Sequence, residues 1–139
     1  MTAAKSWVLT DAERDIWLET FKLTPADLGM EGDWSIEKRV LRGGPGDGVD
    51  VIEVDNGALS FSILPTRGMG IWKGRYSGLD IGWNSPVRGP VHPNLVDLQD
   101  RGGLGWLAGF DEAIVRCGLD STGAPGPDVV PTNMGVPTQ

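Results

Sequence analysis

The feature that most constrains the fold of this chain is the run from Asp55 to Ile63. It opens with an Asn-Gly pair at positions 56 and 57, which is typical of the tight type I′ turn that joins two twisted antiparallel strands. After the turn, apolar residues at 59, 61 and 63 alternate with serines at 60 and 62, so one face of the segment is apolar and the other polar. This run predicts an antiparallel hairpin over Val49–Leu64 and a mainly β fold.

Further short runs of β type surround the hairpin and are separated by loops rich in glycine and proline. These runs are Asp33–Leu41, Met69–Tyr76, Ile81–Trp83 and Ala113–Cys117. The chain contains 21 Gly and 10 Pro, so much of its backbone is expected to lie in turns and irregular loops between short strands. The whole pattern favours an antiparallel β-sheet.

The segment before the sheet is predicted to be helical. Thr10 is followed three positions later by a glutamate, the spacing of a capping box, in which each side chain binds a free backbone N–H at the start of a helix. Ile16, Trp17 and Phe21 then form a loose apolar stripe. We therefore expect a short N-terminal helix over Asp11–Phe21.

The domain organisation follows from where these patterns begin and end. Residues 1–33 are expected to form a helical extension, which includes a short turn beginning at Thr24-Pro25, and residues 34–139 form the β-domain. No periodicity is visible over Ser121–Gln139. Because complete domains normally protect the edges of an open antiparallel sheet, one interpretation is that the chain is the N-terminal portion of a longer β-domain. The other is a finished domain with a disordered tail.

Charge and composition exclude several classes of function. Lys plus Arg number 12 and Asp plus Glu number 19, and the resulting net charge of −7 argues against binding to nucleic acid or to an anionic membrane. No apolar run approaches the ~18 residues that span a bilayer, and the N-terminus does not have the pattern of a signal peptide. A single Cys excludes an internal disulfide and favours a cytoplasmic location. With one Cys and one His, we expect no metal and no other cofactor.

Arg67 is the first candidate for a binding residue. It lies between two expected strands and is followed by glycines at 68 and 70, where the backbone can approach a ligand closely. A guanidinium at such a position can donate several hydrogen bonds to sugar hydroxyls, or it can form a structural ion pair with a carboxylate. The sequence leaves both roles open.

Aromatic and titratable residues supply the other candidates. Trp83, Trp106 and Phe110 could stack on the C–H face of a sugar or could belong to the core. His92 is the only histidine and a candidate acid or base, although no partner pattern accompanies it in its proline-bounded loop. Cys117 lies in an apolar context typical of a buried thiol. Carboxylates that could act as an acid–base pair are plentiful and no pair stands out: Asp97, Asp100, Asp111, Glu112 and Asp120.

Three short runs occur in series along the chain. They are Ile-Leu-Pro-Thr-Arg-Gly-Met-Gly-Ile at 63–71, Gly-Leu-Gly-Trp-Leu-Ala-Gly-Phe at 103–110, and Arg-Cys-Gly-Leu at 116–119, followed by Gly-Ala-Pro at 123–125. In this order and spacing they resemble the N-terminal half of an aldose 1-epimerase-like family within the galactose-mutarotase-like superfamily. The resemblance extends from about Trp34 to Asp128. One departure is Gly70, where members of the family often carry Asp.

The resemblance implies an antiparallel β-supersandwich that binds sugars in an open cleft, and this chain would hold an incomplete part of it. It also implies chemistry at the anomeric carbon, where a Glu base removes the proton of the anomeric hydroxyl and a His acid protonates the ring oxygen. The family's His is expected soon after the Cys-Gly-Leu run and its Glu later still, and neither is found by Gln139. No catalytic residue is therefore expected in this chain.

The resemblance thus predicts a fragment of an aldose 1-epimerase-like isomerase that is inactive as it stands and whose partner is a small-molecule sugar. The alternative is a non-catalytic sugar-binding or assembly module. Arg67, Trp106 and Arg116 are the residues expected to contact the sugar. Arg67 is expected to point toward the concave face of the sheet, with the other two as its neighbours. The sequence makes no prediction of the oligomeric state.

Overall fold

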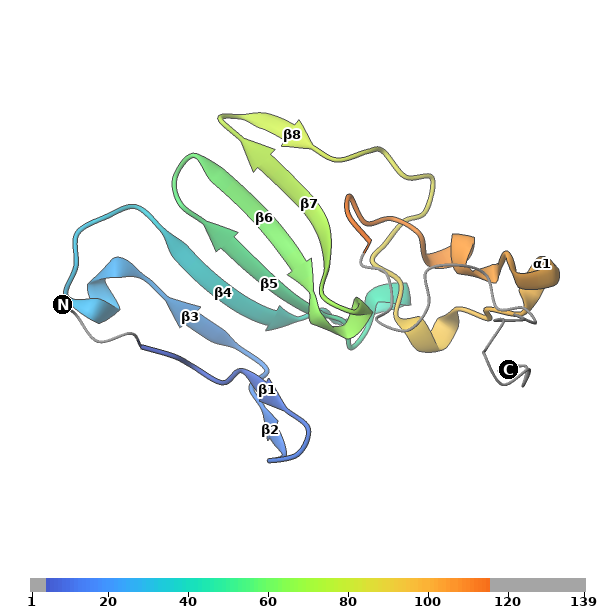
Figure 1. Ribbon diagram of the computed structural model, residues 1–139, viewed down its shortest axis with the longest axis horizontal. Coiled ribbons are helices and arrows are strands. Elements are labelled where there is room, and N and C mark those ends of the chain that lie inside the picture. Colours follow the sequence, from blue (N-terminus) through green and yellow to red (C-terminus); the bar gives the residue numbers. More distant parts are fainter. Residues whose placement is uncertain (1–4, 116–139) are drawn as a thin grey trace, which may run out of the picture.

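A six-stranded antiparallel sheet dominates the computed structural model, which describes residues 5–115. Each strand is hydrogen-bonded to the strand before it in the chain, so the sheet is a simple meander (Figure 1). Its strands are β3 (Phe21–Leu23), β4 (Ser35–Val40), β5 (Asp50–Asp55), β6 (Leu59–Leu64), β7 (Gly70–Tyr76) and β8 (Leu79–Ile81). A separate two-stranded sheet consists of β1 (Thr10–Asp11) and β2 (Ile16–Trp17). The predicted mainly antiparallel β fold is confirmed.

Helical structure within the described residues is limited to short turns. One is the single turn α1 (Asp100–Gly103), in which Arg101 and Gly102 have left-handed φ values of 52° and 69°. The others are 3₁₀ turns: η1 (Pro25–Leu28), η2 (Gly44–Gly46), η3 (Pro65–Arg67), η4 (Pro93–Leu95) and η5 (Gly105–Gly109). The turn predicted to begin at Thr24 is η1. The backbone N–H and the hydroxyl of Thr24 both donate to the Asp27 carboxylate at 2.7 Å. No helix in residues 5–115 has the length and hydropathy needed to cross a membrane.

The predicted hairpin is present as the antiparallel pair β5 and β6. Its turn differs from the expected type I′, which requires positive φ at two successive residues. In this turn only Gly57 has positive φ, at 87°. Asn56 contributes through its side chain, whose carbonyl oxygen accepts hydrogen bonds from the backbone N–H groups of Ala58 and Leu59 at 3.1 and 2.7 Å. The Asn-Gly pair therefore closes the hairpin through hydrogen bonds of the Asn56 side chain and not through a type I′ backbone.

The predicted helix over Asp11–Phe21 is wrong. This segment forms β1, a tight turn and β2, and then enters β3 of the main sheet. The Asp11 side chain closes the turn by accepting hydrogen bonds from the backbone N–H groups of Glu13 and Arg14, both at 3.0 Å. Asp15 then adopts a left-handed φ of 53°, which interrupts any right-handed helix. The division of the chain at residue 33 stays a prediction.

A buried ion pair holds the N-terminal hairpin against the main sheet. The side chain of Lys38, in β4, is 2% exposed, and its Nζ donates to Asp50 Oδ1 at 2.5 Å and to the carbonyl oxygen of Leu18 at 2.6 Å. Leu18 directly follows β2. Because a charged and a neutral oxygen both accept from the ammonium, much of the cost of its burial is offset. Lys38 therefore links the end of β2 to β4 and β5.

The two faces of the main sheet differ. One face carries a small buried core, made of Val49, Val51 and Leu64 with Leu41 and Trp72 packed against it. The strand register and the alternation of side chains place on the other face Ile36, Val54, Phe61, Ile71 and Ile81. We call this second face the apolar face. These residues are half-buried or exposed. Within residues 5–115 no second large sheet covers them.

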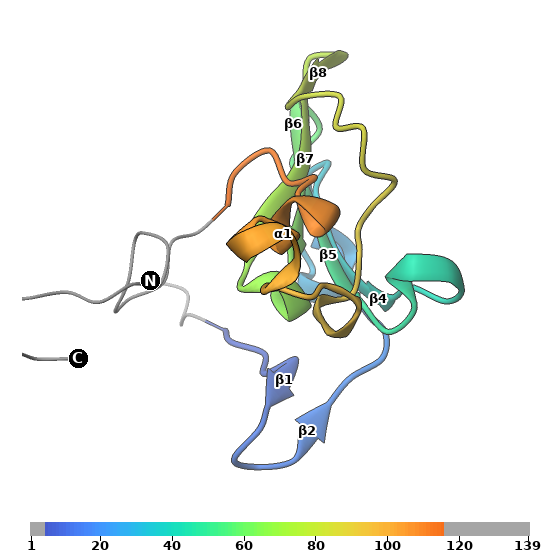
Figure 2. The ribbon, with the colours of Figure 1, turned by 90° about the vertical axis from the view of Figure 1, so that its right-hand side faces the viewer.

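The segment after β8 returns to the end of the sheet where β6 is followed by β7. In Figures 1 and 2 this yellow-to-orange segment leaves β8, passes around that end and comes back to β7. Contact with β7 is made by Ile114, which exchanges backbone hydrogen bonds with Ile71 at 2.9 and 3.0 Å. Of the strand predicted over Ala113–Cys117, the described residues form one isolated β-bridge, at Ile114. Cys117 lies outside the described residues.

Candidate functional site

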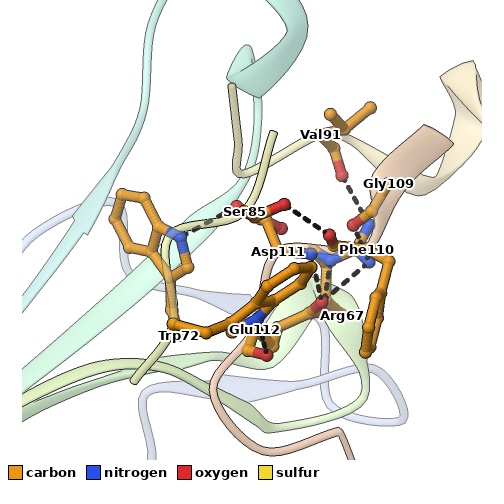
Figure 3. Close-up of polar contacts among 9 residues, drawn as sticks. Arg67, Trp72, Ser85, Val91, Gly109, Phe110, Asp111 and Glu112 are labelled. Carbon is orange, nitrogen blue, oxygen red and sulfur yellow. Dashed lines mark hydrogen bonds and ion pairs between the residues drawn. The ribbon is translucent and has the colours of Figure 1, made fainter. Parts of the chain in front are cut away.

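Arg67 joins separate parts of the chain at this end of the sheet (Figure 3). It is the last residue of η3, directly after β6. Its Nε donates to Glu112 Oε1 at 2.5 Å, and its Nη2 donates to Glu112 Oε2 at 3.2 Å. Nη1 donates to the carbonyl oxygen of Val91 and Nη2 to that of Gly109, both at 2.7 Å. The side chain therefore ties η3 to the loop at Val91, to the end of η5 and to the Glu112 carboxylate.

Both members of the ion pair are shielded from solvent. The Arg67 side chain is 14% exposed and the Glu112 side chain is 3% exposed. Forked pairing of a guanidinium with a carboxylate is strong and fixes the orientation of both groups. Since most of the guanidinium N–H groups already have acceptors, few remain for a ligand. Of the two roles that the sequence left open for Arg67, this geometry corresponds to the structural ion pair.

Asp111 lies beside this pair and is incompletely hydrogen-bonded. The residue is 6% exposed, and its Oδ2 accepts a hydrogen bond from Trp72 Nε1 at 2.8 Å (Figure 3). Its Oδ1 is buried and has no hydrogen-bond partner among the described residues. Burial, and after it the negative charge of Glu112, raises the pKa of the Asp111 carboxyl above its ordinary value of 3.8. Asp111 therefore holds a proton more readily than an exposed aspartate does.

Three aromatic side chains next to these carboxylates form what we call the aromatic row: Trp83, Phe110 and Trp106. Phe110 is in the middle, with its ring centroid 5.3 Å from that of Trp83 and 5.2 Å from that of Trp106. The two outer residues are 47% and 45% exposed. Trp83 is held by a hydrogen bond from its Nε1 to the carbonyl oxygen of Glu112 at 3.1 Å. The row thus presents two half-exposed indoles in a fixed arrangement.

An apolar groove of about 710 Å³ lies between the apolar face of the sheet and two members of the aromatic row, Trp83 and Phe110. The sheet contributes Phe61, Ile71 and Ile81 to its walls, and the returning segment contributes Trp83 and Phe110. Small-molecule sites are typically hollows of roughly 300–1,000 Å³ with mostly apolar walls and a few polar groups. The groove therefore has the size and character of a small-molecule site.

Other residues that the sequence singled out have local roles. His92 Nδ1 accepts a hydrogen bond from the backbone N–H of Asn94 at 3.2 Å, which caps η4. Asp97 and Asp100 are exposed. No group of three or more His, Cys, Asp or Glu side chains within residues 5–115 is arranged to hold a metal ion. Three of the candidates lie outside the described residues: Arg116, Cys117 and Asp120.

The structure brings together only part of the predicted site. Arg67 meets Glu112, which the sequence had named only as one of many carboxylates. Trp106 is at one end of the aromatic row and contacts Phe110 edge-on, at an interplanar angle of 77°. No local pattern singled out Trp72 or paired it with Asp111, although Trp72 Nε1 donates a hydrogen bond to Asp111 Oδ2.

Comparison with known protein families shows the class to which the chain belongs. Residues 46–135, more than half of the chain, match a family described as a domain of unknown function, DUF4432. The chain therefore belongs to this family. Among curated proteins, no sequence matches it significantly.

A solved structure extends this relationship. The chain is similar to the crystal structure of a putative aldose 1-epimerase from Klebsiella pneumoniae subsp. pneumoniae MGH 78578, with 39% sequence identity and a TM-score of 0.77. The similarity covers 81% of this chain and 30% of that chain, so this chain spans less than a third of the Klebsiella protein. The resemblance to aldose 1-epimerase-like proteins, predicted from three short runs, is confirmed.

Proposed function

We propose that this chain binds a small-molecule sugar and is part of an aldose 1-epimerase-like isomerase. The observation that carries the proposal is the 39% identity to the Klebsiella protein, which extends over 81% of this chain. An aldose 1-epimerase acts at the anomeric carbon of a sugar. If this chain binds the same class of ligand, we expect it to contain a hollow of sugar size with aromatic side chains beside it.

The apolar groove and the aromatic row support the sugar-binding part of the proposal. Indole rings stack on the apolar C–H faces of sugar rings, and each can keep its N–H for a polar partner. Trp106 is 45% exposed at one end of the row, and the hydrogen bond to Glu112 fixes Trp83 at the other. Trp106 does not line the apolar groove itself but contacts Phe110, which does, and it is our candidate for a stacking surface beside the groove.

Arg67 has a supporting role in this proposal. Its hydrogen bonds to Gly109 and Glu112 hold the segment that carries Phe110, the centre of the aromatic row. It is therefore a positioning residue and not a direct contact of the sugar. Arg116 follows the last described residue and is proposed as a sugar contact on the family resemblance alone.

Turnover is not expected of this chain by itself. Anomerisation requires an acid and a base, each of which typically contributes about 10²–10⁴-fold. His92 is the only histidine in the sequence, and its Nδ1 is engaged with the backbone of Asn94. The family resemblance assigns the acid and the base to other positions. We therefore expect sugar binding by the 139-residue chain without anomerisation.

The proposal is tested by titrating D-galactose and D-glucose into the 139-residue chain, with calorimetry and tryptophan fluorescence as readouts. We expect binding of at least one sugar, weakened about two- to tenfold by Trp106→Ala, as for the loss of one aromatic contact. Trp17→Ala is the matched control, since Trp17 is 60% exposed on β2. Failure to bind either sugar, or equal effects of the two substitutions, would contradict the proposal. Polarimetry on freshly dissolved α-D-glucose would reveal any turnover.

An assembly module is the second candidate, and the apolar face, which no second large sheet covers within residues 5–115, favours it. Contiguous exposed apolar surface commonly marks an interaction site. In this case light scattering would show a defined oligomer of the wild-type chain. Leu79→Glu, which places a charge on a residue of β8 that is 72% exposed, would return the protein to a monomer. A monomeric wild-type chain would exclude this candidate.

A further inference from the structure

The apolar groove has few polar groups for a site proposed to bind a sugar. Of the eleven described residues that line it, eight have aliphatic or aromatic side chains, two are glycines and one is Glu112. The Glu112 carboxylate is 3% exposed, and both of its oxygens accept hydrogen bonds from Arg67. The other polar side-chain atom, Trp83 Nε1, donates to the carbonyl oxygen of Glu112. Each polar side-chain group in this wall therefore already has a partner within the protein.

Such a wall suits an apolar group better than a sugar ring. The hydroxyl groups of a sugar buried in the groove would give up hydrogen bonds to water, and the side chains around them offer none in return. An apolar group, in contrast, is stabilised when it leaves water for apolar surroundings. The groove therefore selects for the apolar part of a ligand.

A glycine in the middle of the sheet shapes the floor of the groove. Gly74 of β7 is paired with Phe61 of β6 on one side and with Ile81 of β8 on the other. Because paired residues point to the same face, the missing side chain leaves a gap between those of Phe61 and Ile81. The rings of Trp83 and Phe110, with centroids 5.3 Å apart, form another part of the wall. A flat group such as an aryl ring can enter this gap and contact the aromatic rings beside it.

The sugar ring itself has a more suitable place next to the groove. Trp106 contacts Phe110 edge-on and is 45% exposed. The hydroxyl groups of a sugar stacked on this indole remain in water, and a substituent on the sugar can extend past Phe110 into the groove. The substituent must be on a carbon other than the anomeric one, because an aldose 1-epimerase requires a free anomeric hydroxyl.

We propose that the ligand of this chain is a reducing sugar with an aryl or similarly flat apolar substituent, and that the apolar groove binds this substituent while the sugar ring lies beside Trp106. The proposal rests on the sugar-binding function proposed above and specifies the class of sugar.

The test uses two acetals of D-glucose that differ only in the size of their apolar group. The benzylidene acetal carries a phenyl ring on the carbon that bridges O4 and O6, the ethylidene acetal carries a methyl group there, and both keep the anomeric hydroxyl free. Each is titrated into the full 139-residue chain, with calorimetry and tryptophan fluorescence as readouts. We expect the benzylidene acetal to bind about ten- to hundredfold more tightly, as for the burial of the additional apolar surface. D-Glucose, D-galactose and benzyl alcohol are titrated alongside.

Gly74→Val locates the phenyl ring. A Cβ at residue 74 would lie in ordinary contact with Ile81 Cβ, at 3.4 Å, and valine is well suited to a strand, so the variant is expected to fold. Its side chain fills the gap in the floor, and we expect it to remove most of the difference in affinity between the two acetals. Arg75→Val is the matched control, because it introduces the same side chain at the next position of β7, on the opposite face of the sheet. This control should bind both acetals like wild type.

The outcomes separate this inference from the function on which it rests. If wild type binds D-glucose or D-galactose and binds the two acetals equally, the inference is wrong and the sugar-binding function stands. If wild type binds none of the sugars or acetals, both are wrong. The inference is also wrong if benzyl alcohol binds as tightly as the benzylidene acetal, since the sugar then contributes nothing.

An unchanged preference for the benzylidene acetal in Gly74→Val would place the phenyl ring outside the groove and overturn the inference. Should Gly74→Val not fold, Ile81→Ser replaces it, since Ile81 is 49% exposed and forms the neighbouring part of the wall. Ile81→Ser is expected to weaken binding of the benzylidene acetal, and an unchanged affinity would overturn the inference in the same way.

Discussion

The guanidinium of Arg67 and the carboxylate of Glu112 are joined by two hydrogen bonds across 45 positions of sequence, at 2.5 and 3.2 Å. Because both side chains are largely buried, this pair fixes the returning segment against the end of the sheet. The same guanidinium holds the carbonyl oxygens of Val91 and Gly109. The conformation of the candidate site therefore depends on one arginine that is itself part of the fold.

Arg67→Ala should reduce stability strongly. The substitution leaves the Glu112 carboxylate buried without its partner, and breaking a buried pair in this way typically costs about 3–5 kcal/mol. Urea denaturation measures the effect. Arg75→Ala is the control, since Arg75 and Asp80 form an exposed pair at 3.6 Å and its loss should change stability little. A variant that keeps wild-type stability and loses only sugar affinity would show that Arg67 is a ligand contact instead.

Asp111 should give the protein a specific pH dependence. Its pKa is higher in the folded chain than the ordinary value of 3.8, so the folded state binds this proton more tightly than the unfolded state. This contribution to stability is greatest at low pH and is lost as the pH rises through the folded pKa. The stability of wild type relative to Asp111→Asn should therefore rise as the pH falls from about 7 toward about 4. Paired urea titrations measure this difference, and a constant or opposite trend would contradict the assignment.

Lys38→Met should detach the N-terminal hairpin from the sheet. The substitution leaves Asp50, 18% exposed, without its cation and frees the carbonyl oxygen of Leu18, so we expect a loss of about 3–5 kcal/mol. Replacing both partners, Lys38→Met with Asp50→Leu, should recover most of this loss, because no charge is then left unpaired. The exposed pair of Lys22 with Glu37 provides the control, and Lys22→Met should have little effect. If the double variant is no better than Lys38→Met, the ion pair is not the cause.

Gly89→Ala should disturb Asp111 through direct overlap. A Cβ at residue 89 cannot coexist with Asp111 Oδ2 in its present position, so either the loop or the carboxyl must move. Overpacking of this kind costs about 1–3 kcal/mol, and it would break the hydrogen bond from Trp72. Adding Asp111→Ala removes the overlapping atoms and should recover part of the stability. The check is a double-mutant cycle by thermal unfolding, in which strictly additive effects would exclude the overlap.

The meander could be predicted because its signals are local. The Asn-Gly pair and the alternation after it identified the β5–β6 hairpin, although Asn56 acts through its side chain and not through positive φ. The helix over 11–21 was wrong because the same polar spacing that starts a helix can also close a tight turn. At Asp11 the carboxylate binds two backbone N–H groups, and the left-handed Asp15 then reverses the chain.

The candidate site was less predictable because its contacts are remote in sequence. Arg67 was singled out by the glycines after it, but its pairing with Glu112 depends on how the segment after β8 returns to the sheet. The hydrogen bond between Trp72 and Asp111 spans 39 positions and has no local signature. Trp106 was recognised as a candidate from its residue type, whereas its place at the end of the aromatic row required the fold.

The meander also has a consequence for the order in which the molecule forms during its synthesis. Each strand of the main sheet pairs with the one made just before it, so the sheet can grow as the chain leaves the ribosome, without waiting for distant partners. Arg67, in contrast, must wait for Gly109 and Glu112, which are made more than 40 residues later. We therefore expect pulse-labelled hydrogen exchange during refolding to protect β4–β6 before the segment around Glu112. Arg67 would then be the last residue at this end of the sheet to form its native contacts.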